Sequence, residues 1–163
     1  MIARVIIEGL ILGGLLVLFC LVAIKDGAVG AVFLYDEKVQ KRSVELGLTT
    51  PGRIKKRQKA FRGGGVCAYI AYVLICAYLI NGARGFSDGF VQMYLMLLIC
   101  NLIDRFFIDE LWVCRTKCWI IPGTEDLMPY ITTRDKVKKW ISGIVGMAVI
   151  AAILSAVMLI FVR

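Results

Sequence analysis

Long apolar segments alternate with charged connections along this chain of 163 residues. The apolar segments cover about residues 5–24, 66–80, 88–108 and 140–162. A helix needs roughly 20 apolar residues to cross a hydrocarbon core of about 30 Å. The pattern therefore predicts an all-α, polytopic membrane protein with four transmembrane helices in a single domain, residues 1–163. The composition agrees, because 60% of the residues are apolar, whereas soluble domains average about half.

The first apolar segment is predicted to remain in the membrane as an anchor. Its apolar stretch is longer than the usual core of a signal peptide, and Glu8 interrupts it. No cleavage site of small residues follows it. Arg4 lies one helical turn from Glu8, so these two residues are expected to pair at the membrane interface.

Basic residues are concentrated in the first and third connections. The first connection carries ten of them against four acids, the turn at 81–89 carries only Arg84, and the segment 104–139 carries seven. By the positive-inside rule, the connections 25–62 and 109–139 are expected to lie in the cytoplasm. Both termini then face outside, and the chain is expected to be a multi-pass protein of the plasma membrane.

Residues 30–62 are predicted to form a cytoplasmic αα-hairpin that extends the first two transmembrane helices. Its first arm is expected to be one continuous helix that ends at Gly47, a typical C′ residue. Thr50 then suits the N-cap of the second arm, with Pro51 at its first helical position. The glycines at 63–65 are expected to weaken or bend this arm where it enters the membrane.

The second arm of this hairpin is strongly basic, and we expect it to contact anionic lipid headgroups. A basic segment just inside a membrane span gains ~1 kcal/mol per Lys or Arg near the surface. Such runs can also bind nucleic acid, but the position beside a span favours lipid, and no nucleic-acid partner is expected. The residues concerned are Lys55, Lys56, Arg57, Lys59 and Arg62.

The third connection, with its loop at 119–135, is predicted to be an ordered excursion. Its sequence IPGTEDLMPY contains a Pro-Gly turn and a second proline. Thr132 and Asp135 form a capping-box pattern that opens the last helix. Glu125 and Asp126 are a candidate loop site at the cytoplasmic mouth of the protein.

The segment NLIDRFFIDELWV, residues 101–113, places charges where the third helix should still be apolar. If residues 90–118 form one α-helix, with about 100° between successive residues, its polar side chains share one face. Glu110 and Lys117 would point away from that face. The resulting stripe is a candidate binding site and consists of Tyr94, Asn101, Asp104, Arg105, Asp109, Trp112, Arg115 and Thr116.

Three interpretations of this stripe are open. Charges at such depth cost about 2.5–3.5 kcal/mol each on insertion scales and usually mark function, so an ion, a proton or a lipid headgroup could bind here. Alternatively, the two aspartates and two arginines balance one another as an internal salt-bridge network, with Arg105 and Asp109 spaced to pair. Catalytic carboxylates are the third interpretation, but they need a raised pKa that adjacent arginines oppose. If the stripe carries protons, Asp104→Asn should abolish function and Glu110→Gln should be tolerated.

The residue types exclude several classes of active site. The chain has no histidine, which excludes Ser-His-Asp and Cys-His nucleophiles, HExxH zinc sites and His-ligated haem. Four of the six cysteines lie in apolar segments, where cysteine behaves as a small hydrophobe. Cys114 and Cys118 are one turn apart but make only half a zinc site, so we expect unmodified thiols. No metal, cofactor or catalytic residue is assigned.

Four segments together resemble a family of small, functionally uncharacterised bacterial membrane proteins, sometimes loosely labelled permease-like. They are ELGLTTPGRIKK (45–56), NGARGF (81–86), NLIDRFFIDELWV (101–113) and TKCWIIPGTEDLMPYI (116–131). The resemblance covers most of the chain from about residue 30 and implies a four-helix membrane fold without implying a reaction. The family's motif residues map onto Asn101, Asp104, Asp109, Trp112, Lys117, Pro122, Gly123, Thr124, Glu125 and Asp126.

These features favour a binding, transport or membrane-complex component over an enzyme. A four-helix protomer of 18.1 kDa is small for enclosing a pathway, so a homo-oligomer or a membrane partner is expected. One alternative is an intramembrane enzyme for a lipid-like substrate at the cytoplasmic interface, which predicts carboxylates that converge away from the arginines. The other is a structural or regulatory subunit, which predicts that the charges are fully paired and dry.

Overall fold

The computed structural model describes residues 1–161, and all of its regular elements are helical. Four helical stretches are long and apolar enough to cross a membrane, by length and composition. Val162, the last residue of the fourth predicted span, lies outside the described residues. The four stretches are α1 (Ile2–Ile24), α3 (Pro51–Leu74) continued by η2 (Ile75–Ile80), α4 (Gly85–Ile103) continued by η3 (Asp104–Val113), and α5 (Thr133–Phe161).

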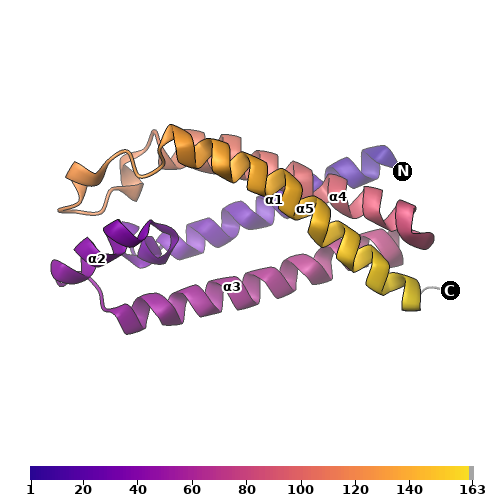
Figure 1. Ribbon diagram of the computed structural model, residues 1–163, viewed down its shortest axis with the longest axis horizontal. Coiled ribbons are helices and arrows are strands. Elements are labelled where there is room, and N and C mark those ends of the chain that lie inside the picture. The colour runs from indigo at the N-terminus through magenta and orange to yellow at the C-terminus, as the bar shows by residue number, and fades with distance from the viewer. Residues whose placement is uncertain (162–163) are drawn as a thin grey trace.

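The long helices alternate in direction, so both described ends of the chain lie at the same end of an elongated molecule (Figure 1). The turn between η2 and α4 lies at that end too, and the first and third connections lie at the opposite end. Helix α4 is the central element, because it packs against both α1 and α5. Figure 1 shows α3 standing further apart, so the bundle is tight on one side and open on the other.

Small residues allow the close packing on the tight side. A Cβ atom added at Gly9 of α1 would lie 2.9 Å from the Cβ of Ile99 on α4. A Cβ atom at Gly143 of α5 would lie 2.6 Å from Oδ1 of Asn101, also on α4. Larger side chains at these two glycines would push the neighbouring helices away from α4.

The first connection differs from the prediction in its first arm. In place of one helix, the chain forms the 3₁₀ segment η1 (Ala28–Leu34), two extended residues, and the short helix α2 (Glu37–Glu45). The 3₁₀ segment buries a dense apolar set against α1 and α3, and this tertiary contact overrides helix continuation. The buried residues of η1 are Ala28, Gly30, Ala31, Val32 and Phe33.

The helix caps predicted in this connection are confirmed. Gly47 has a φ of 71°, and the N–H of Leu48 donates to the carbonyl of Ser43 at 3.0 Å, as in a Schellman motif. The hydroxyl of Thr50 accepts from the N–H of Arg53 at 3.4 Å. Helix α3 then continues as one α-helix through the glycines at 63–65.

The third connection is ordered, as predicted. It contains two short 3₁₀ segments, η4 (Lys117–Trp119) and η5 (Glu125–Leu127). The capping box before α5 is confirmed, because the N–H of Asp135 donates to the Thr132 hydroxyl at 3.3 Å while the N–H of Thr132 donates to the Asp135 carboxylate at 3.0 Å.

Glu8 has a different partner from the one predicted. Its carboxylate is buried in α1 and accepts a hydrogen bond from Nδ2 of Asn81 at 2.8 Å. Nη1 of Arg4 donates to Oδ1 of the same Asn81 side chain, at 3.5 Å. The prediction of a direct Arg4–Glu8 pair was therefore wrong. Asn81 lies between the two residues, because the turn after η2 folds back over α1.

Candidate functional site

The charged part of the third long helix is wound as a π-helix. Hydrogen bonds in η3 run from residue i+5 to residue i, as in the 3.1 Å bond from the N–H of Cys114 to the carbonyl of Asp109. The wider turn of a π-helix brings side chains four and five residues apart to the same side of the helix. Asp104 and Asp109 are five residues apart, so their carboxylates lie closer in direction than they would on an α-helix, where about 140° separates them.

A network of ion pairs joins these carboxylates to two cations. The guanidinium of Arg105 binds both Asp104 and Asp109. Nζ of Lys139, on α5, lies 3.2 Å from Oδ2 of Asp109. The side chains of Arg105, Asp104 and Asp109 are 14%, 24% and 13% exposed, so the network is largely shielded without being dry.

Glu110 forms a second tie between η3 and α5. It was predicted to point away from the polar face, and its carboxylate lies 2.5 Å from Nζ of Lys136 on α5. Both side chains are more than a third exposed, so the pair contributes little to stability by itself. Its effect is to fix the first turn of α5 beside η3.

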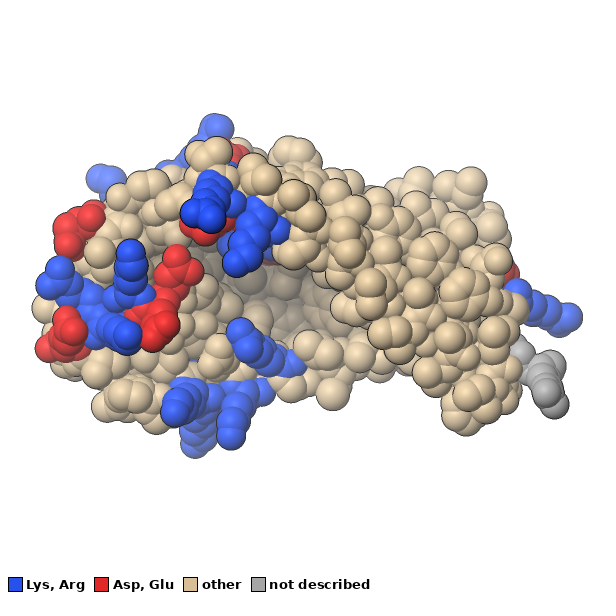
Figure 2. Space-filling model, in the orientation of Figure 1, with Lys and Arg blue, Asp and Glu red and all other residues tan. Residues whose placement is uncertain are grey.

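The network lines a cavity of about 500 Å³, called here the charged cavity. It opens between the first part of α5 and the middle of α3 at Phe61, and Figure 2 shows a hollow in this region with acidic and basic side chains around it. Its polar side chains come from four parts of the chain. They are Tyr35, Asp36, Asp104, Arg105, Asp109, Trp119, Tyr130, Asp135, Lys138, Lys139 and Ser142.

An apolar pocket of about 390 Å³ adjoins the charged cavity. The two share Leu16 of α1 and Phe61 of α3 as lining residues. The apolar pocket lies between α3 and α5, on the open side of the bundle, and its only charged lining residue is Arg62. The remaining lining residues are Phe19, Gly65, Val66, Tyr69, Ile70, Val73, Leu97, Met147, Ile150 and Leu154.

The structure brings together only part of the predicted stripe. Asp104, Arg105 and Asp109 line the charged cavity. The other five members lie elsewhere. Asn101 is buried against Gly143, Tyr94 stacks on Phe90, and Trp112 packs edge-on against Trp119. Arg115 and Thr116 are exposed beyond the end of η3.

The candidate loop site does not face the charged cavity. Oδ2 of Asp126 lies 3.1 Å from Nη2 of Arg42 on α2, and both side chains are largely exposed. Glu125 is also exposed. The loop is anchored by packing, since Gly123 lies against Leu46 at the end of α2. Asp126 therefore fastens the third connection to the first.

Sequence reasoning missed the residues that the connections and α5 contribute. Lys138 and Lys139 counted only as a topology signal, although their position just before the last apolar segment places them level with the end of η3. The hydroxyl of Tyr35 donates to the carbonyl of Trp119 at 2.5 Å, and burial raises the pKa of that hydroxyl. It therefore stays protonated and holds η1 against the third connection.

The basic face of α3 is less uniform than predicted. Four of the five named residues, Lys55, Lys56, Lys59 and Arg62, are exposed. Arg57 turns inward, where it binds the carboxylate of Asp26 and the carbonyl of Gly30, both at 2.7 Å. Only the first four are free to contact lipid headgroups.

Within residues 1–161, no three cysteine, aspartate or glutamate side chains group closely enough to hold a metal ion. The cysteines of this part of the chain are free thiols. Comparisons of the chain with protein-family models, curated proteins and solved structures find no match.

Proposed function

We propose that this chain is a multi-pass membrane protein that binds an amphiphile, with the polar head in the charged cavity and the alkyl part in the apolar pocket. The observation that carries this proposal is the continuity of the two spaces, which share Leu16 and Phe61. A ligand site that is polar at one end and almost wholly apolar at the other matches a lipid-like molecule better than an ion or a water-soluble solute.

The depth of the two spaces along the helices supports this assignment. Asp104 is 19 residues after Gly85, the first residue of α4, and 19 residues of helix rise about 28 Å. This is close to the thickness of a hydrocarbon core, so the charged cavity lies at one membrane interface. The apolar pocket extends from there toward the membrane centre along α3 and α5. By the positive-inside rule, we assign the charged interface to the cytoplasmic side.

The charge pattern of the cavity favours binding over the alternatives. Asp104 and Asp109 both bind Arg105, so neither is the unpaired carboxylate that acid–base chemistry favours. Lys138 lines the cavity, is exposed, and has no ion-pair partner among the described residues. An open cavity with a free ammonium group is also unlike the dry, fully paired network of a purely structural subunit.

Neighbouring glycines on α3 provide a matched test. Gly65 lines the apolar pocket, Gly64 does not, and an added Cβ meets no atom within 4 Å at either position. The protein is purified, exchanged into phosphatidylcholine nanodiscs, and irradiated with a phospholipid that carries a photoreactive acyl chain. Adducts are then mapped by mass spectrometry, where we expect labelling of α3 and α5 residues that line the pocket.

Gly65→Trp should fill the pocket and remove most of this labelling, whereas Gly64→Trp should leave it unchanged. Lys138→Gln should weaken retention of the lipid, and Arg134→Gln, on an exposed residue of the same basic cluster, should not. Labelling spread evenly over all lipid-facing residues, with no response to Gly65→Trp, would contradict the proposal.

A further inference from the structure

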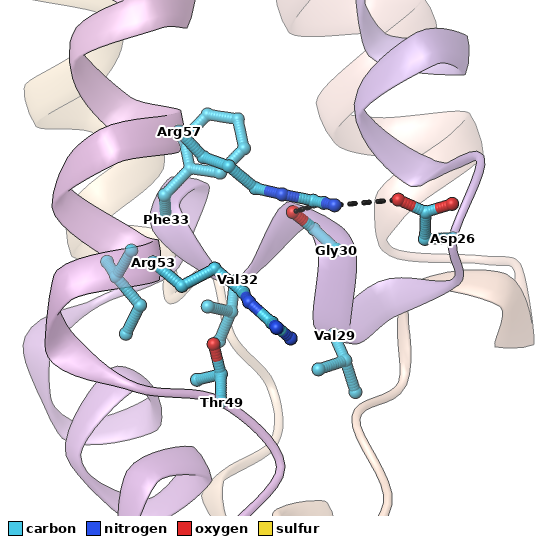
Figure 3. Close-up of a pocket in the computed structure, with 9 residues that line it drawn as sticks. Asp26, Val29, Gly30, Val32, Phe33, Thr49, Arg53 and Arg57 are labelled. Atoms are coloured by element: carbon cyan, nitrogen blue, oxygen red, sulfur yellow. Dashed lines mark hydrogen bonds and ion pairs between the residues drawn. The ribbon is translucent and has the colours of Figure 1, made fainter.

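A second polar pocket lies at the same end of the molecule and shares no lining residue with the charged cavity. This basic pocket has a volume of about 240 Å³ and lies between η1 and the first turns of α3 (Figure 3). Its polar side chains are Asp26, Thr49, Arg53 and Arg57, and Val29, Val32, Phe33 and Ile54 form its apolar walls.

Arg57 is held in place before any ligand arrives. Its Nη1 donates to the carbonyl of Gly30 and its Nη2 to the carboxylate of Asp26, both at 2.7 Å. A Cβ atom at Gly30 would lie 2.7 Å from the same Nη1, so the glycine makes room for the guanidinium. This arrangement fastens η1 to α3 and fixes the guanidinium at the edge of the pocket.

These contacts occupy the side chains of Arg57 and Asp26, but they do not involve Arg53. Arg53 is one helical turn earlier on the same face of α3, and Figure 3 shows its side chain extending toward η1 beside Thr49. In the described part of the chain, its guanidinium has no ion-pair partner, and the single carboxylate in the pocket is bound to Arg57. Like charges four residues apart on a helix repel, so the empty pocket carries an uncompensated positive charge.

The pocket also supplies a hydroxyl group and is accessible from solvent. Thr49 is 7% exposed as a residue, and its side chain lies beside Arg53. Arg53 is exposed and the Arg57 side chain is 39% exposed, so a soluble anion can reach both guanidinium groups from water. Two guanidinium groups and a hydroxyl on one side of a small pocket suit a group with several acceptor oxygens and more than one negative charge.

We propose that the basic pocket binds a phosphate group, with Arg53 and Thr49 as direct ligands and Arg57 as the preorganised cation beside them. The phosphate can belong to a water-soluble compound or to a lipid headgroup. Arg53 is nine residues before Arg62, the last charged residue of α3, which places it ~14 Å further from the membrane centre along the helix. That distance favours a soluble phosphate compound.

The test uses the full-length protein in phosphatidylcholine nanodiscs, with pyrophosphate as the soluble probe and calorimetry as the readout. We expect saturable binding that weakens as salt concentration rises, since the attraction is largely electrostatic. Arg53→Gln should weaken binding by about tenfold or more, because it removes a charge-assisted contact. Arg53→Lys should give an intermediate loss, since it keeps the charge but not the planar fork.

Lys55→Gln is the matched control. Lys55 is an exposed cation on the same helix that does not line the pocket, so its loss should change affinity by less than about twofold. A second arm repeats the series in nanodiscs that also contain phosphatidic acid. If the added lipid displaces pyrophosphate from the wild type but has no effect on residual binding to Arg53→Gln, the phosphate site stands and its source is a headgroup.

Two outcomes would overturn the inference. One is the absence of saturable binding of either phosphate probe to the wild-type protein. The other is an equal loss of affinity in Arg53→Gln and Lys55→Gln, which would mean that general positive charge attracts the probe. Binding that depends on Arg53 alone supports the site whichever probe reveals it.

Discussion

The charged cavity and the basic pocket lie at the same end of the molecule, yet they are built in opposite ways. In the charged cavity, Arg105 and Lys139 face two aspartates, so cations and acids are matched within a few ångströms. In the basic pocket, two arginines face one aspartate. The balance of positive and negative charge therefore distinguishes the two sites.

This difference indicates what each site can attract. Matched charges neutralise one another, so the Arg105–Lys139 network offers polar groups without a strong field, which suits the headgroup of mixed character that we propose. Unmatched cations create a field that draws an anion and that salt weakens. The four variants below change the balance, the geometry or the surroundings of one site at a time.

The largest effect is expected when the balance of the charged cavity is destroyed. Arg105→Ala leaves two shielded carboxylates beside each other with only Lys139 to compensate them. Breaking such a pair commonly costs about 3–5 kcal/mol, so we expect a loss of at least ~3 kcal/mol in the free energy of unfolding. Unfolding in mixed micelles, followed by circular dichroism, measures this loss.

Two further variants serve as controls for that result. Arg115→Ala removes an exposed arginine of the same region and should change stability by less than about 0.5 kcal/mol. The double variant Arg105→Gln with Asp104→Asn removes one charge of each sign and keeps the Lys139–Asp109 pair, so it should recover more than half of the loss. Equal destabilisation by Arg105→Ala and Arg115→Ala would show that the network is not a balanced unit.

The second largest effect on stability is expected where α5 packs closely against α4, since this packing brings Lys139 of α5 to Asp109. Gly143→Ala places a Cβ atom 2.6 Å from Oδ1 of Asn101, a side chain that is 4% exposed. Overpacking of this kind typically costs 1–3 kcal/mol, so we expect a loss of about that size, measured by the same unfolding assay. Gly146→Ala is the control, because a Cβ atom there meets nothing within 4 Å. Its helix propensity should stabilise the protein slightly, and destabilisation by both variants would contradict the close α4–α5 contact.

The sequence predicted the local features of this fold well. The Schellman motif at Gly47, the N-cap at Thr50 and the capping box at Thr132 depend on hydrogen bonds between residues a few positions apart, so the residue types suffice to identify them. The four long helices follow from apolar length alone. The antiparallel course of the second and third long helices follows from the short turn between η2 and α4.

The features that the sequence missed depend on contacts between distant segments. No local pattern marks η3 as a π-helix, and a projection at about 100° per residue therefore placed Arg115 on the same face as Asp104 and Asp109. The break between η1 and α2 follows from burial against α1 and α3. Lys139 joins the site only because Gly143 lets α5 approach α4 closely.

A third, smaller effect tests the geometry of the basic pocket. Gly30→Ala introduces a Cβ atom 2.7 Å from Nη1 of Arg57 and 3.2 Å from the carbonyl oxygen of Ala23, so the guanidinium must move. Losing part of its hydrogen bonding should cost ~1 kcal/mol of stability and weaken pyrophosphate binding. Gly52→Ala, at an open position in the first turn of α3, should instead be neutral or slightly stabilising. Unchanged binding in Gly30→Ala would show that Arg57 need not be preorganised.

The smallest effect lies at the rim of the charged cavity, where a single acid can be removed without opening the network. Cys114 follows η3 directly, and its thiol pKa lies above the ordinary value of 9.0, because burial disfavours the thiolate and Glu110 and Asp109 repel it, while Lys136 and Lys139 oppose this shift. At pH 8 the thiolate is therefore scarcer than in a free cysteine, and alkylation at Cys114 should be slower than that of a reference peptide.

Glu110→Gln removes a repelling carboxylate and frees Lys136, so the pKa of the Cys114 thiol should fall and alkylation at pH 8 should accelerate by about two- to threefold. Peptide-resolved mass spectrometry measures the rate at Cys114, with Glu125→Gln as a distant acidic control. Because a lowered pKa matters only while the thiol is mostly protonated, the acceleration should vanish at high pH. A ratio that stays constant from pH 7 to pH 11 would mean that access to the thiol had changed, and not the charge balance around it.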